Sequence, residues 1–274
     1  MIIPDLHRRP ATVDRDKHRQ TVLRVPVSDW APIATMNALF VTAAECPQLA
    51  TEYPIFFVKA GVDDKGAVDY APIAVFGMAK GENLYVDGPR WRATVLPSQL
   101  AMYPLCVARL AADRYAVCID ESWAGVATEG PGERLFTDAG EPTEFIQRMQ
   151  ASLEKLEGQI DQTRAVGRRL AALDLLRERR FDATLPDGRK IAVDGFFMVD
   201  EARLKALPDD QLLALHREGL LGLIHAHWIS SGHMRRLLNW RVERDAGDAA
   251  APLPAAAPPA PAAPETPAKP PPGA

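Results

Sequence analysis

The sequence predicts an α+β protein in which a mostly antiparallel β-sheet, built from a meander and hairpins, packs against a long amphipathic helix and a helical C-terminal region. Three observations lead to this class. Residues 52–92 hold the densest group of short β-branched and aromatic runs, each ended by a turn signal. Apolar residues recur at helical spacing across 145–173. Capping and breaking residues then mark further helices after residue 200.

Length and composition fit a globular protein with a hydrophobic core. The chain has 274 residues, of which 47% are hydrophobic and 25% are charged, and both fractions are close to the average for globular domains. The formal net charge of −4 argues against a nucleic-acid-binding protein, because such proteins usually present a basic face.

The segment before the meander predicts few regular elements. Its first part, 1–20, is charged and interrupted by proline, so we expect a flexible N-terminal arm. Short strands are expected within 21–27 and at 39–41. Thr42 and Glu45 have the spacing of a capping box, which predicts a short helix from Ala43 to about Thr51.

The central stretch predicts an antiparallel meander with strands at 55–58, 68–76 and 84–86. The first strand is a continuous apolar run, which is typical of a strand buried on both faces. The turn residues Asp-Asp-Lys-Gly follow it. Pro72 has no N–H to donate, so the second strand should lie at a sheet edge or carry a bulge there.

A second hairpin and a long loop follow the meander. Pro97 and Ser98 open a short helix, and residues 105–110 and 115–119 then predict two paired strands. The glycine-rich stretch 120–142 predicts a loop.

The apolar stripe at 145–173 predicts the longest helix of the protein. Its apolar positions recur at steps of three or four and are Phe145, Met149, Leu153, Leu156, Ile160, Leu170 and Leu173. Tertiary burial usually explains such a stripe, so we expect it to pack on the sheet. The alternative is a helix that binds a partner or a second copy of the chain, which would give a homodimer.

A third hairpin is predicted between 181–185 and 190–199, because Asp187-Gly188 is a strong turn signal. Asp200 and Pro208 each open a short helix after it.

Apolar residues at 220–228 and 234–240 predict two last helices. Residues 245–274 are dominated by proline and alanine, which bury too little surface to offset the entropy of ordering. We therefore expect a disordered tail there, and a single folded domain over 21–244.

Cysteine usage and the absence of targeting signals predict a cytoplasmic protein. Cys46, Cys106 and Cys118 form no C-x-x-C pair, and such a sparse set is typical of reduced cysteines. The N-terminus lacks the apolar region of a signal peptide. No apolar run approaches the ~20 residues of a membrane span.

The loops around residues 80–91 are the candidate ligand-binding site, since loops on a sheet scaffold often carry function. The charged and aromatic side chains that would line a pocket there are Lys80, Glu82, Tyr85, Asp87, Arg90 and Trp91. Turn formation alone also explains much of this composition, so a purely structural role stays open as the alternative.

His225 and His227 are weak candidates for metal ligands. An H-x-H pair suits a strand, whereas this segment predicts a helix, on which the two side chains would be ~200° apart. The alternative is one buried, hydrogen-bonded histidine and one at the surface. We therefore predict no metal site and no cofactor.

Two further groups are candidates for catalytic residues. Asp120 and Glu121 follow a strand directly, and paired carboxylates can perform acid–base catalysis, but adjacent residues on an extended chain point apart. Cys118 lies in an apolar strand that disfavours its thiolate, so we expect an inert thiol. No nucleophile elbow and no phosphate-binding loop is present.

Several segments, in order, resemble the SapC family of bacterial proteins, and the resemblance covers about residues 20 to 240. The matching segments are EYPIFFVK (52–59), GMAKGENLYVD (77–87), YAVCIDE (115–121), LFTDAGEPT (135–143), LPDGRKIAVDGFFMVDEARLKALPDDQLLALHREGLLGLIHAH (185–227) and MRRLL (234–238).

The resemblance implies a role in a bacterial surface or nutrient-uptake system. The family is named after a surface-array (S-layer) locus, and its relatives tend to be encoded near TonB-dependent receptors and halogenase-like proteins. It offers no catalytic residues to carry over. We therefore expect a non-enzymatic accessory or ligand-binding protein. The alternatives are a metal- or cofactor-assisted enzyme that uses the 81–91 loops with His225 or His227, and a structural component of a surface layer.

Overall fold

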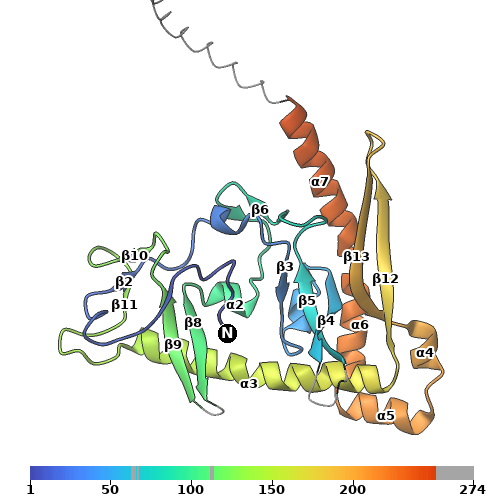
Figure 1. Cartoon of the computed structure of the whole chain (residues 1–274), viewed down its shortest axis with the longest axis horizontal. Coiled ribbons are helices and arrows are strands. Elements are labelled where there is room, and N and C mark those ends of the chain that lie inside the picture. Colours follow the sequence, from blue (N-terminus) through green and yellow to red (C-terminus); the bar gives the residue numbers. More distant parts are fainter. Residues whose placement is uncertain (63–65, 67, 112–113, 251–274) are drawn as a thin grey trace, which may run out of the picture.

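The computed structural model describes residues 1–62, 66, 68–111 and 114–250. It confirms the α+β class. Two groups of antiparallel strands lie along one long helix, α3 (Glu144–Ala172), and helices of the C-terminal region cover the larger group (Figure 1).

The larger sheet has five strands in the order β12-β13-β4-β5-β3, and every neighbouring pair is antiparallel. Its strands are β3 (Ala38–Phe40), β4 (Ile55–Val62), β5 (Val68–Val75), β12 (Leu176–Thr184) and β13 (Lys190–Val199). Two predicted hairpins, β4–β5 and β12–β13, are thereby confirmed. Gly188 has a φ of 85° in the second hairpin, as expected from its Asp-Gly turn.

The predicted third strand of the meander is wrong. Residues 84–86 do not join the five-stranded sheet, because β3 takes the position beside β5. Instead, β6 (Val86–Asp87) pairs with β7 (Arg90–Trp91) in a two-stranded ribbon. Leu84 and Tyr85 are buried by side-chain packing rather than within a strand, and a short apolar run cannot distinguish these two cases.

Pro72 lies at the point where β5 becomes a sheet edge. Its carbonyl accepts a hydrogen bond from the Val41 N–H at 3.1 Å, on the side of β3. The N–H and C=O of one strand residue point the same way, so the missing donor of Pro72 faces the end of β3, whose last residue is Phe40. β5 as a whole has a neighbouring strand on each side, so the expected edge is found only in its first part, where the register with β3 has ended.

The second group of strands is built around the predicted hairpin of β8 (Leu105–Ala111) and β9 (Arg114–Asp120), and β1 (Pro10–Thr12) pairs with β9. The connection that we placed at 112–113 lies outside the described residues. A small neighbouring sheet contains β10 (Val126–Ala127), β2 (Val22–Leu23) and β11 (Glu133–Arg134). The expected loop at 120–142 thus contributes two very short strands.

The first 20 residues are packed onto the fold, so the expectation of a flexible arm is wrong for them. Pro10 lies opposite Asp120 in the β1–β9 pair, and Leu6, His7 and His18 are buried. Charge and proline content suggested a solvated segment, but burial here depends on a strand pairing between residues about a hundred positions apart, which local composition does not reveal.

Helix α3 confirms the apolar stripe and contributes to both hydrophobic cores. Leu153 and Leu156 pack in the core of the β8–β9 group, whereas Leu170 packs in the core of the five-stranded sheet. A Cβ on Gly167 would lie 1.9 Å from the Tyr70 carbonyl oxygen of β5, so only glycine allows this close approach. The protein's own sheets bury most of the stripe, whereas a homodimer through 145–173 remains a prediction.

Four helices complete the C-terminal region: α4 (Glu201–Lys205), α5 (Asp209–Arg217), α6 (Leu220–Ser230) and α7 (His233–Ala250). The predicted cap at Asp200 is confirmed, because its side chain accepts a hydrogen bond from the Arg203 N–H at 3.0 Å. Helix α7 continues past residue 245, where we expected the tail to begin. The remainder of the expected tail, 251–274, lies outside the described residues.

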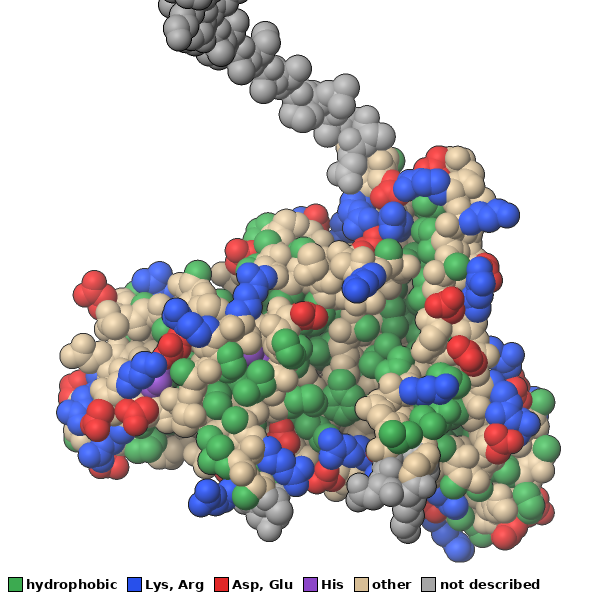
Figure 2. All heavy atoms as spheres, viewed as in Figure 1, with side chains coloured by type: hydrophobic (Ala, Val, Ile, Leu, Met, Phe, Trp, Pro, Cys, Tyr) green, Lys and Arg blue, Asp and Glu red, His purple; other side chains and the backbone are tan. Residues whose placement is uncertain are grey.

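The remaining short elements are η1 (Ala31–Ile33), α1 (Cys46–Leu49) and α2 (Ser98–Ala101). Within the described part of the chain, no helix is both long and apolar enough to cross a membrane. On the face drawn in Figure 2, acidic and basic side chains alternate around the periphery and hydrophobic side chains gather in the middle, so no field of one sign covers this face.

Candidate functional site

The aromatic residues of the predicted 80–91 site form part of the core. Tyr85 is fully buried, stacks on Tyr53 at 4.6 Å and on Trp91 at 5.5 Å between ring centroids, and meets Trp240 of α7 edge to face. Its hydroxyl donates to the Glu52 carbonyl oxygen at 2.6 Å. Burial raises the pKa of Tyr85 far above its ordinary value. The Tyr85 side chain therefore packs between the 80–91 loops and α7.

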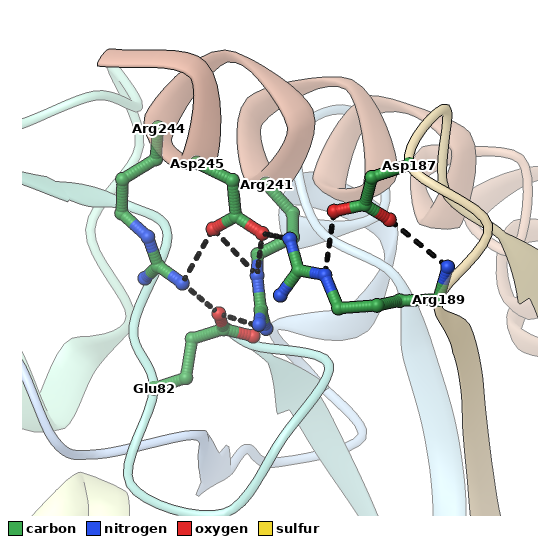
Figure 3. Close-up of polar contacts among 6 residues, drawn as sticks. All are labelled: Glu82, Asp187, Arg189, Arg241, Arg244 and Asp245. Atoms are coloured by element: carbon green, nitrogen blue, oxygen red, sulfur yellow. Dashed lines mark hydrogen bonds and ion pairs between the residues drawn. The ribbon is translucent and has the colours of Figure 1, made fainter. Parts of the chain in front are cut away.

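Glu82, the acidic residue of that site, is held by two arginines of α7. It is only 5% exposed, and one of its oxygens bonds Arg241 at 2.7 Å and also Arg244 (Figure 3). The other oxygen accepts from the Met78 N–H at 2.8 Å. The carboxylate is thus neutralised and saturated within the protein.

The ion pairs of Glu82 continue into a network that joins three segments (Figure 3). Asp245 of α7 bonds Arg241 at 3.0 Å and Arg189 at 2.6 Å. Arg189 in turn bonds Asp187 at the turn of the β12–β13 hairpin. Burial would raise the pKa of Asp245, but its bonds to Arg189 and Arg241 hold that pKa below the ordinary value. The network fixes α7 between the 77–82 loop and the hairpin.

The other predicted site residues lie at the surface of this region. Lys80 is exposed, and Arg90 bonds Asp87 at 3.2 Å across the turn between β6 and β7. The structure therefore brings Tyr85 and Trp91 together and ties Asp87 to Arg90, but it turns Glu82 toward α7. A ligand-binding role for the six residues remains a prediction.

His225 and His227 lie on opposite faces of α6, and they match the predicted alternative of one histidine at the surface and one that is buried and hydrogen-bonded. His225 is exposed. His227 is only 1% exposed: its Nδ1 lies 2.7 Å from the Ile55 carbonyl oxygen and its Nε2 lies 3.3 Å from the Val199 nitrogen. Since Val199 can only donate, Nε2 accepts and Nδ1–H donates. Burial lowers the pKa of His227 to about 4, so it is neutral.

His227 and two neighbours close the gap between β4 and β13, which share a single registered pair. The Ser230 hydroxyl accepts from the Ile55 N–H at 3.0 Å, and the Trp228 indole donates to the Val199 carbonyl oxygen at 2.8 Å. Side chains of α6 therefore bond both backbone groups of Ile55 and both of Val199. Among the described residues, no group of His, Cys, Asp and Glu could hold a metal ion.

Asp120 and Glu121 point to different partners, as expected for adjacent residues. Asp120 is fully buried and accepts from the Tyr103 hydroxyl at 2.9 Å, the Ser122 hydroxyl at 2.7 Å and the Arg9 N–H at 2.9 Å. Burial would raise its pKa, but the hydrogen bonds from Ser122, Arg9 and Tyr103 lower it below the ordinary value. Glu121 instead lies 3.3 Å from His18.

Cys118 has a second cysteine as its cross-strand neighbour, and its expected lack of reactivity remains a prediction. It lies directly opposite Cys106 in the β8–β9 pair, and both cysteines are free and buried. The two side chains are therefore cross-strand neighbours, and the Cys118 thiol donates to the Ala116 carbonyl oxygen at 3.7 Å. The sequence-based argument considered only the apolar strand and missed the cross-strand neighbour.

A cavity of about 160 Å³ lies at the boundary between the core of the five-stranded sheet and the core of the β8–β9 group, and we call it the junction cavity. It is lined by residues from 5–8, 27–33 and 122–124, together with Tyr103. Trp123 packs against both hydrophobic cores, which places the cavity at their boundary. A neighbouring hollow of about 350 Å³ shares Val27, Trp30 and Tyr103 with it.

The junction cavity combines aromatic walls with a polar group at its base. Trp30, Tyr103 and Trp123 supply the aromatic surface, and the Tyr103 and Trp123 rings meet at 67° with centroids 5.8 Å apart. The hydroxyls of Tyr103 and Ser122 are both oriented by Asp120. A mostly apolar hollow with a few fixed polar groups is the usual form of a small-molecule site.

Sequence reasoning did not identify this cavity. Its lining comes from segments about a hundred residues apart, and none of them carries a recognisable motif. The only local signal was the Asp-Glu-Ser-Trp stretch at 120–123, which we considered for its carboxylates rather than for Ser122 and Trp123.

The family model described as SapC matches residues 13–237 of the chain. No curated protein and no solved structure matches the chain.

Proposed function

This chain belongs to the SapC family, and we propose that it is a non-enzymatic protein that binds a small molecule in the junction cavity. The observation that carries the proposal is the cavity itself, which combines aromatic walls with two hydroxyls held by a buried carboxylate. Ordered polar groups in an apolar hollow can fix the orientation of a ligand.

The size of the junction cavity sets the size of the ligand. Its volume of about 160 Å³ is close to the ~150 Å³ of an engineered cavity that binds benzene. The bound group should therefore be no larger than about one six-membered ring, with any remainder of the molecule in the neighbouring hollow or in solvent.

The proposal favours the junction cavity over the 80–91 loops. In the loops, the Glu82 carboxylate is already neutralised by two arginines and Tyr85 is stacked inside the core. Around the junction cavity, by contrast, Asp5, Asp29 and Ser122 are exposed and open to a ligand.

A fragment screen tests the proposed site. Single-ring compounds would be screened against the full chain by ligand-observed NMR, and each hit would be repeated on Ala124→Trp, which fills the rim of the cavity. Ala202→Trp, at an exposed position on α4, is the matched control. We expect hits that Ala124→Trp abolishes and Ala202→Trp retains. An absence of hits, or hits that both variants retain, would count against the proposal.

The biological setting is also proposed. An accessory role in a bacterial surface or nutrient-uptake system, linked to TonB-dependent uptake or halogenase-like proteins, is proposed from the resemblance of the sequence segments. Affinity capture of the chain from its native host, with Ala124→Trp as a parallel bait, tests whether such a partner depends on the cavity. Recovery of neither class of protein would argue against this setting.

A further inference from the structure

We propose that the junction cavity recognises a small quaternary ammonium group, such as the trimethylammonium head of choline. This inference rests on the proposed function and specifies its ligand class. Three features support it: the aromatic walls, the excess of carboxylates around them and the dimensions of the cavity.

The walls match the preference of a cation for aromatic faces. Trp30 and Tyr103 are 6% and 9% exposed and are therefore fixed by packing. Trp123 meets Tyr103 at 67°, so the two rings offer surfaces in different directions. The negative faces of aromatic rings attract an ammonium cation, tryptophan most strongly, and proteins recognise quaternary ammonium ligands with cages of aromatic side chains.

The charges near the cavity favour a cation over an anion. Asp5 and Asp29 line its rim together with Arg8, whose guanidinium donates to the Pro32 carbonyl oxygen at 2.8 Å. Behind Tyr103 and Ser122 lies Asp120, and each hydrogen bond that it accepts comes from an uncharged group. Two carboxylates and one guanidinium thus line the site, and a third carboxylate, Asp120, lies behind two of the lining residues.

A quaternary ammonium also fits the apolar part of the lining. It carries no N–H, so it enters without needing hydrogen bonds, and its methyl groups suit Leu6, Val27 and Ile33 in the lining. A primary ammonium would lose its bonds to water there. Four methyl-sized groups around one centre also fill about the volume of a single ring, which is the size that the cavity accepts.

Isothermal titration of the full chain with choline and with its neutral carbon isostere, in which a quaternary carbon replaces the nitrogen, tests the inference. The two ligands have the same shape, so the difference in affinity isolates the charge. We expect choline to bind at least about tenfold more tightly. Equal affinities, or tighter binding of the isostere, would overturn the inference.

Variants locate the effect in the cavity. Asp29→Asn keeps the oxygen that accepts from the Ala31 N–H at 3.0 Å but removes a charge, so choline should bind about threefold or more weakly while the isostere is unaffected. Asp16→Asn is the matched control, since that side chain is 87% exposed and lies outside the lining. Equal effects of the two substitutions would contradict the assignment.

The experiments distinguish failure of the quaternary ammonium inference from failure of the proposed ligand site. If fragments bind in a way that Ala124→Trp abolishes, yet choline does not bind or acetate binds better, the cavity is a ligand site and only the ammonium inference is wrong. If no ligand is sensitive to Ala124→Trp, the proposed function itself is wrong.

Discussion

Replacing His227 with leucine should destabilise the protein strongly, because this side chain bonds two backbone groups that are otherwise unpaired. The substitution leaves the Ile55 carbonyl and the Val199 N–H buried without these partners. Each such loss costs about 1–3 kcal/mol, partly offset by the apolar burial of leucine. We expect a net loss of about 3 kcal/mol, which lowers the Tm by roughly 6–12 °C for a chain of this size.

His227→Gln separates bonding from titration. A glutamine amide can donate to the Ile55 carbonyl and accept from Val199, so it should cost less than leucine. The folded pKa of His227, about 4, lies below the unfolded value of 6.5. The unfolded chain then binds more protons between these values, and stability is full above pH ~6.5 and falls as the pH is lowered toward ~4.

The magnitude follows from the same shift. Between about pH 7 and pH 5, His227 should account for roughly 2 kcal/mol of lost stability. His7, whose pKa burial also lowers to about 4, should contribute similarly. Urea unfolding at several pH values measures both effects. The reasoning is refuted if His227→Leu stays within ~1 kcal/mol of the natural protein, or if His227→Gln leaves the pH dependence unchanged.

Three further substitutions or treatments test other contacts. Gly167→Ala should lower stability by about 1–3 kcal/mol, because the added Cβ would lie 1.9 Å from the β5 backbone. The control Gly158→Ala, on the same helix and with open space around it, should raise stability by up to ~1 kcal/mol. Similar thermal shifts for both variants would exclude this close approach. Glu82→Gln should weaken both ion pairs to α7 and speed amide exchange in that helix, so unchanged exchange would argue against the network as its anchor. Mild hydrogen peroxide should oxidise Cys106 and Cys118 to a disulfide, with loss of two hydrogen atoms from the thiols and release of two waters. Three thiols that can still be alkylated after this treatment would show that the pair does not react.

The sequence predicted the elements whose signals are local. The stripe of α3, the Asp-Gly turn at 187–188 and the cap at Asp200 each depend on residues a few positions apart, and the structure contains all three. The long-range strand pairing of β1 carries no such signal, so the packed N-terminal segment was missed.

Residue type was a weaker guide to the site than to the fold. Tyr85 and Glu82 have the chemistry of a binding loop, but the aromatic stacking and the arginines that engage them come from other segments, Glu52–Tyr53 and α7. Trp30 and Trp123 lie in segments without periodicity, and only tertiary packing brings them to one cavity. Contacts between distant segments decide which candidate remains open to a ligand.

Fluorine NMR of the full chain labelled with 5-fluorotryptophan shows which of the two candidate sites binds the ligand, because the five tryptophans report on both. Saturating choline, or the best fragment, should shift the resonances of Trp30 and Trp123 and leave that of Trp228 in place. Shifts confined to Trp91 and Trp240 would place the ligand at the 80–91 loops and contradict the account.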